Sequence, residues 1–79
     1  MTDLEKMDER QKMMLWHMRD DYVHFRNLND LTPSLYLLFD QLTDPQECLF
    51  SKYEKFTGKE KIQIIRAFTN WALEQEEME

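Results

Sequence analysis

Glycine, proline and cysteine are scarce in this chain. Its 79 residues include one Gly, two Pro and one Cys, against an average share of about 7% Gly and 5% Pro. A sheet protein needs turn residues at every chain reversal, so this composition favours helices joined by short corners. The single cysteine, Cys48, excludes an intrachain disulfide. Lone thiols are usually packed side chains of proteins in reducing compartments, so we expect a buried Cys48 and a cytoplasmic location.

Long apolar runs are also absent. The N-terminal stretch lacks the apolar core of a signal peptide, and no run approaches the ~20 apolar residues of a membrane span. The sequence therefore predicts neither export nor a membrane contact.

The sequence lacks the motifs that usually carry catalysis. It has no glycine-rich phosphate loop, no nucleophile elbow, and no zinc signature of the HExxH or clustered Cys/His kind. His17 and His24 share a helix face with Asp20 and Asp21, but two turns separate the histidines by ~10.5 Å along the axis. We therefore expect solvated His–Asp pairs there. The prediction is no enzyme, no metal, no cofactor and no small-molecule substrate.

What the chain does contain is enough apolar surface for one small core. Apolar residues make up 42% and aromatic residues 13% of the sequence, which is outside the range of disordered segments. One domain covering residues 1–79 is the expected organisation, and at this size self-association is a simple way to gain stability. The net charge of −6 disfavours general binding to nucleic acids or anionic membranes.

The most apolar stretch is LTPSLYLLFDQL, residues 31–42. Its apolar side chains follow helical spacing on one face, while Tyr36 and Leu37 place apolar bulk on other faces. Thr32 has the character of an N-cap followed by Pro33 at the first helical position. We expect a buried helix over about 33–42, at the centre of the fold.

A long helix is predicted before it, over about 2–27. Thr2 and Glu5 have the spacing of a capping box at its start. Its main apolar stripe contains Leu4, Met7, Gln11, Met14, Leu15, Met18, Tyr22 and Phe25. Met13, Trp16 and Val23 lie on a second apolar flank, which this core would leave uncovered.

Two further helices are predicted after it. Asp44 and Pro45 repeat the cap-and-proline pattern and start a short helix over about 45–56, with Leu49, Tyr53 and Phe56 inward. At the next corner, either Thr57 and Glu60 form a capping box or Gly58 closes the preceding helix in a left-handed conformation.

The last helix is expected over about 59–76. Its inward face contains Ile64, Ala67, Phe68 and Trp71, and Ile62, Ile65 and Ala72 widen that face. The acidic end, about 75–79, should fray because carboxylates oppose the helix dipole there.

Together these patterns predict an all-α, compact four-helix domain. Two long helices, about 2–27 and 59–76, would enclose two short ones, about 33–42 and 45–56, laid end to end.

The uncovered flank gives the leading functional hypothesis. Trp and Met are enriched in the buried centres of protein interfaces, so Met13, Trp16 and Val23 predict contact with a protein partner or a second copy, as in a homodimer. The small, acidic composition is typical of cytoplasmic regulators, inhibitors and accessory proteins of bacteria or phages.

Two alternatives involve nucleic acids. Residues 51–66 are locally basic, so a DNA-binding helix-turn-helix within about 51–70 is the main alternative. Its candidate contacts are Lys52, Lys55, Lys59, Lys61 and Arg66. A lesser alternative is that the acidic surface mimics DNA and inhibits a nucleic-acid-binding protein.

Overall fold

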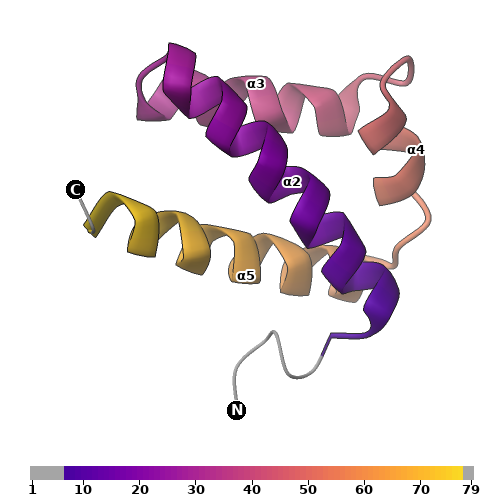
Figure 1. Cartoon of the computed structure of the whole chain (residues 1–79). Coiled ribbons are helices and arrows are strands. Elements are labelled where there is room, and N and C mark those ends of the chain that lie inside the picture. The colour runs from indigo at the N-terminus through magenta and orange to yellow at the C-terminus, as the bar shows by residue number, and fades with distance from the viewer. Residues whose placement is uncertain (1–6, 78–79) are drawn as a thin grey trace.

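The computed structural model describes residues 7–77, and in this range the only regular secondary structure is α-helix (Figure 1). The helices are α2 (Glu9–Leu28), α3 (Leu31–Thr43), α4 (Cys48–Tyr53) and α5 (Gly58–Glu77). The predicted all-α class, with two long and two short helices, is confirmed. None of these helices is both long and apolar enough to cross a membrane.

The first described helix begins later than its sequence pattern suggests. Asp8 is the N-cap of α2: its Oδ1 accepts a 2.9 Å bond from the Gln11 N–H, and Gln11 Oε1 accepts a 3.0 Å bond from the Asp8 N–H. With this capping box the helix begins at Glu9, so α2 has 20 residues, not about 25. The Thr2–Glu5 capping box lies outside the described residues.

Helix α3 starts earlier than predicted and is buried on one face only. Asp30, not Thr32, is its N-cap, and the Asp30 carbonyl accepts bonds from both the backbone N–H and the hydroxyl of Ser34. Leu38 and Leu42 are buried, but Tyr36 is 69% exposed. The expectation of burial around the whole helix is therefore wrong, because α3 is covered from one side.

Helix α4 is shorter than expected because Asp44 makes a turn instead of a helix cap. Its Oδ1 accepts a 3.0 Å bond from the Gln46 N–H, and its carbonyl accepts one from Glu47. The helix then runs for six residues from Cys48. Leu49 faces the core, whereas Cys48 is exposed, so the predicted burial of this thiol is wrong.

The last helix settles the two interpretations of the corner before it. Thr57 and Glu60 bond reciprocally, at 2.8 and 3.2 Å, as a capping box does. Gly58 has no positive φ, so it is not a left-handed cap. The expected widening of the inward face by Ile62 is wrong, since this side chain is 59% exposed. The helix also continues through the part of the tail, residues 75–77, that we expected to fray.

Helix α2, not α3, is at the centre of the fold. It packs against α3, α4 and α5, whereas α3 and α5 barely approach each other along their backbones. Figure 1 shows α3, α4 and α5 as three sides of a frame, with α2 crossing in front of it. The dimensions of 35 × 31 × 16 Å fit two helix layers, since packed helices lie about 8–10 Å apart. We expected residues 31–42 in this central role.

The core lies where α2 crosses the frame. Its buried apolar side chains are Met7, Met14, Leu15, Met18, Tyr22, Leu38, Leu42, Leu49, Phe56, Ile64, Phe68 and Ala72. Tyr22 packs edge-on against Phe68 and Trp71, with ring centroids 5.4 and 5.6 Å apart, and Phe39 meets Phe68 at 6.2 Å. These aromatic contacts fix the distance between α2 and α5.

Candidate protein-binding face

The solvent side of α2 carries a line of exposed apolar side chains that the other described residues, 7–77, do not cover. Met13, Trp16 and Val23 are 61%, 56% and 46% exposed. Their spacing puts them on one side of the helix, opposite the buried Met14, Leu15, Met18 and Tyr22, over about 15 Å of its length. We call this line, Met13, Trp16 and Val23, the α2 ridge.

Arg19 holds the aromatic centre of the α2 ridge in place. Its guanidinium carbon lies 4.8 Å from the ring centroid of Trp16 and 4.6 Å from that of Trp71. The cation therefore bridges an exposed indole on α2 and a partly buried one on α5, and such stacking contributes about 0.5–2 kcal/mol. Within the described residues, Arg19 Nε is buried without a hydrogen-bond partner. Trp16 is thus presented in a defined orientation.

A groove of about 360 Å³ runs beside the N-terminal half of the ridge, between α2 and the α4 region. Its apolar lining comes from Met13, Met14 and Phe56. Its remaining lining residues are Arg10, His17, Lys52 and Lys55, and none of the seven is acidic. We call it the α2–α4 groove.

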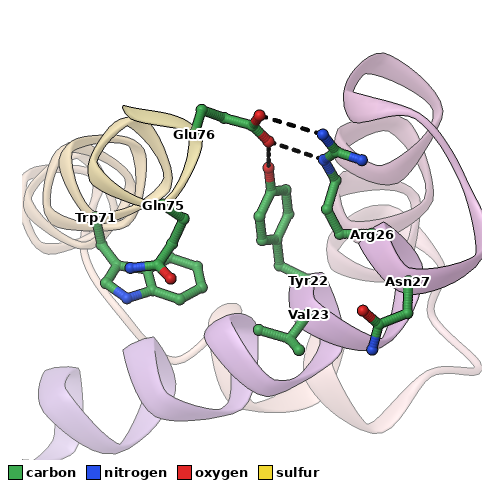
Figure 2. Close-up of a pocket in the computed structure, with 7 residues that line it drawn as sticks. All are labelled: Tyr22, Val23, Arg26, Asn27, Trp71, Gln75 and Glu76. Atoms are coloured by element: carbon green, nitrogen blue, oxygen red, sulfur yellow. Dashed lines mark hydrogen bonds and ion pairs between the residues drawn. The ribbon is translucent and has the colours of Figure 1, made fainter. Parts of the chain in front are cut away.

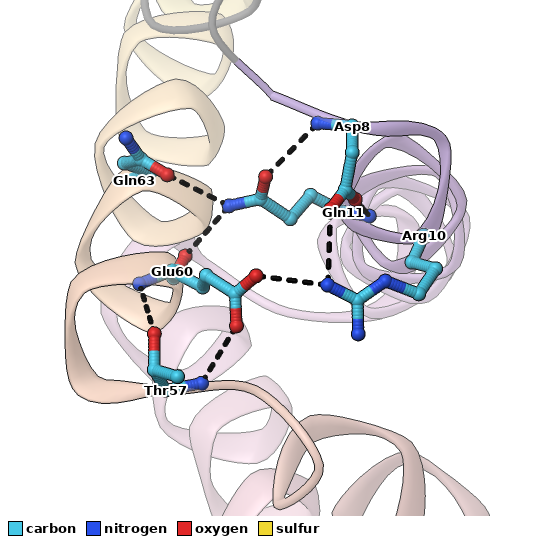
Figure 3. Close-up of polar contacts among 6 residues, drawn as sticks. All are labelled: Asp8, Arg10, Gln11, Thr57, Glu60 and Gln63. Carbon is cyan, nitrogen blue, oxygen red and sulfur yellow. Dashed lines mark hydrogen bonds and ion pairs between the residues drawn. The ribbon is translucent and has the colours of Figure 1, made fainter.

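Polar contacts fix one end of the α2–α4 groove (Figure 3). Arg10 pairs with Asp8 at 3.0 Å and with Glu60 at 2.9 Å, and its guanidinium lies over the Phe56 ring. The Gln11 side chain, which is almost fully buried, donates to Gln63 Oε1 and to the Glu60 carbonyl. These bonds tie the start of α2 to the start of α5.

The same contacts shift the titration of the two carboxyls. The Gln11 backbone N–H and the Arg10 side chain lower the pKa of Asp8. The Thr57 backbone N–H, together with Arg10, lowers the pKa of Glu60. Both carboxylates are therefore ionised at neutral pH, and together they more than offset the single charge of Arg10.

A second hollow, of about 300 Å³, lies at the other end of α2 (Figure 2). One wall is the pair between Arg26 and Glu76, with N–O distances of 2.8 and 3.2 Å, and the Tyr22 hydroxyl donates to Glu76 Oε1 at 3.4 Å. The Arg26 hydrogen bonds lower the pKa of Glu76, while burial raises that of the Tyr22 phenol. The charges here satisfy each other, so this hollow presents no unmatched ion to a ligand.

The lysines predicted for DNA binding differ in their surroundings. Lys52 and Lys55 line the α2–α4 groove, and Lys52 Nζ lies 3.4 Å from His17 Nε2. Lys61 pairs with Glu54 at 3.4 Å and lies over the Tyr53 ring.

Lys59 and Arg66 are exposed on α5, and Thr69 donates to the Arg66 carbonyl. The backbone of the short α4 packs against those of α3 and α2 and barely approaches that of α5, unlike the packed pair of a helix-turn-helix. This arrangement weighs against DNA binding through residues 51–70, which stays a prediction, as does DNA mimicry.

Sequence patterns missed two sets of contacts on this face. Arg19 and Trp71 meet only because α5 crosses α2, and Lys52 and Lys55 join Met13 only because α4 folds back onto α2. No local pattern encodes such contacts between distant segments. The ion pair of Glu76 was missed for the same reason.

Comparisons with family models, curated proteins and solved structures give no match to this chain.

Proposed function

We propose that this chain is a small protein-binding domain that pairs with a second copy through the α2 ridge. The observation that carries the proposal is the exposure of Met13, Trp16 and Val23 in one line on the helix that organises the fold. Side chains of these types favour burial: fully burying an exposed Met or Val contributes roughly 1.5–3 kcal/mol, and covering these half-exposed side chains contributes part of that. A second protein surface supplies that burial.

The centre of the α2 ridge is well suited to binding. Tryptophan, arginine and methionine are enriched at interface cores, and a few such residues usually dominate the binding energy. Stacking against Arg19 already limits the motion of Trp16. Less conformational entropy is therefore lost when a partner covers the indole.

The sequence of the ridge is compatible with a two-fold axis. In an antiparallel pairing of two α2 helices centred near Met18, Met13 of one copy meets Val23 of the other. Trp16 then lies opposite Asp20, so an indole N–H donor faces a carboxylate acceptor. Such self-complementarity is what a symmetric dimer requires. The flat, two-layer shape leaves α2 uncovered on its outer side for this contact.

The test is the molar mass in solution, measured by light scattering at about 100 μM, where dimers of micromolar Kd associate. We expect twice the chain mass for the wild type and the monomer mass for Trp16→Ala. Both should show the same helix content by circular dichroism, since Trp16 is more than half exposed. A monomeric wild-type chain would overturn the proposal.

Tyr36→Ala is the matched control. Tyr36 is an aromatic side chain of similar exposure on α3, outside the ridge. This variant should remain a dimer. If Tyr36→Ala dissociates the dimer and Trp16→Ala does not, the contact surface is elsewhere.

A further inference from the structure

The α2–α4 groove combines an apolar floor with an unbalanced positive rim, on a chain whose net charge is −6. Met14 and Phe56 are buried at its base, and the exposed Met13 forms one edge. Methionine side chains adapt to the shape of an inserted apolar group. The groove therefore offers a place for a bulky side chain of another molecule.

The charges around this groove differ in how they are balanced. Arg10 is neutralised by Asp8 and Glu60 at 3.0 and 2.9 Å. Lys52 and Lys55 are exposed and form no ion pair with any carboxylate in residues 7–77. Lys52 has only the imidazole of His17 at 3.4 Å. Two lysine charges beside the apolar floor are thus available to a ligand.

From this geometry we infer that the α2–α4 groove binds an acidic peptide segment of a partner protein. A bulky apolar side chain of that segment enters between Met13 and Phe56, and its flanking carboxylates pair with Lys52 and Lys55. The inference rests on the proposed role in protein binding. It does not require the dimer, although Met13 belongs both to the α2 ridge and to the edge of the groove.

Charge and shape both favour a peptide over a nucleic acid. A nucleic acid is held by a track of cations along its phosphates, whereas Lys59 and Lys61 do not line this groove, and Lys61 is already paired with Glu54. An apolar floor adds nothing to phosphate binding. It does match the apolar face of an amphipathic helix whose other face carries acidic side chains.

The experiment measures binding of short fluorescein-labelled peptides by fluorescence anisotropy. The test probe has leucine and phenylalanine at helical spacing with glutamate elsewhere. In one control peptide lysine replaces the glutamates, and in a second serine replaces the apolar residues. We expect the test probe to bind with a Kd below about 1 mM, and each control peptide to bind at least about tenfold more weakly.

Protein variants locate the site. Lys52→Glu combined with Lys55→Glu should weaken binding of the test probe at least about tenfold, and raising NaCl from about 0.05 to 0.5 M should weaken wild-type binding. Lys59→Glu is the control for each of these substitutions: it makes half the charge change of the double variant, at an exposed position outside the groove. It should leave binding close to the wild-type value. Circular dichroism checks that all variants fold.

Three results would overturn the inference. They are equal binding of the acidic and basic peptides, equal loss in the Lys59→Glu control, and tighter binding of a labelled DNA duplex at the same lysines. The Trp16→Ala variant separates this inference from the dimer. This variant should still bind the test probe. If the wild-type chain is monomeric but binds the probe, the dimer proposal is rejected and the peptide-groove inference stands.

Discussion

Several side chains in this protein form polar contacts between α2 and α5. Glu76 is the clearest case: it accepts hydrogen bonds from Arg26 and Tyr22, which lie about fifty residues earlier. Gln11 plays the matching part at the start of α2, where its buried amide donates to Gln63 and to the Glu60 carbonyl. Each of these side chains holds α2 against α5.

The ion pair between Glu76 and Arg26 predicts how stability depends on pH. The pKa of Glu76 is lowered from the ordinary value of 4.5 in the folded state. The stability that Glu76 contributes is therefore complete above pH 4.5 and is lost as the pH falls through the lower pKa of the folded state. Glu76→Gln should therefore lower the urea midpoint near neutral pH. The difference from the wild type should shrink as the pH falls below 4.5.

Glu77→Gln is the control for this measurement. Glu77 is exposed, and its substitution removes the same charge one residue further along without touching Arg26. A difference between wild type and Glu76→Gln that persists unchanged in acid would contradict the ion-pair explanation. Asp8 and Glu60 should keep some acid sensitivity in both variants, since their pKa values are also lowered.

At the scale of the helix, local capping chemistry decides where each element begins. The capping boxes at Asp8–Gln11 and Thr57–Glu60 start the two long helices. The pattern at Thr57 was visible in the sequence. The Asp8–Gln11 pair was hidden because Gln11 also fits the apolar stripe of a longer helix. The Asp44 turn shows the opposite case, in which a good capping pattern forms a turn instead of a helix start.

Gly58 tests this description of α5. Its φ is not positive, and an added Cβ would meet no atom within 4 Å. Gly58→Ala should therefore stabilise the fold by about 0.4–1 kcal/mol, because alanine restricts the unfolded chain. Urea unfolding with an unchanged m-value is the measurement. A loss of stability would mean that Gly58 needs the left-handed conformation after all.

For the whole molecule, α2 is the element that joins the others. The core is assembled where Met14, Leu15, Met18 and Tyr22 cross the frame of α3, α4 and α5. The cost of this arrangement is a thin domain, 16 Å in its shortest dimension, with apolar side chains left on the outer side of α2. The proposed binding surface and the core are therefore two sides of one helix.

This arrangement predicts that the chain without residues 1–28 does not fold. The backbones of α3 and α5 barely approach each other, so the fragment 29–79 would lose most of its shared core. We expect no cooperative thermal transition in its circular dichroism. Adding a peptide of residues 9–28 should restore one. A sigmoidal transition in the fragment alone would contradict the central role of α2.

The sequence by itself determined the helical class, the number of described helices, most of their inward faces and the uncovered flank at Met13, Trp16 and Val23. These follow from apolar periodicity and local capping, which depend only on residues a few positions apart. The tertiary structure decided that α2 is central, that Tyr36 and Cys48 are exposed, and that Lys52 and Lys55 meet Met13 at one groove. These depend on how the helices cross, and crossing is set by side chains that are distant in the sequence.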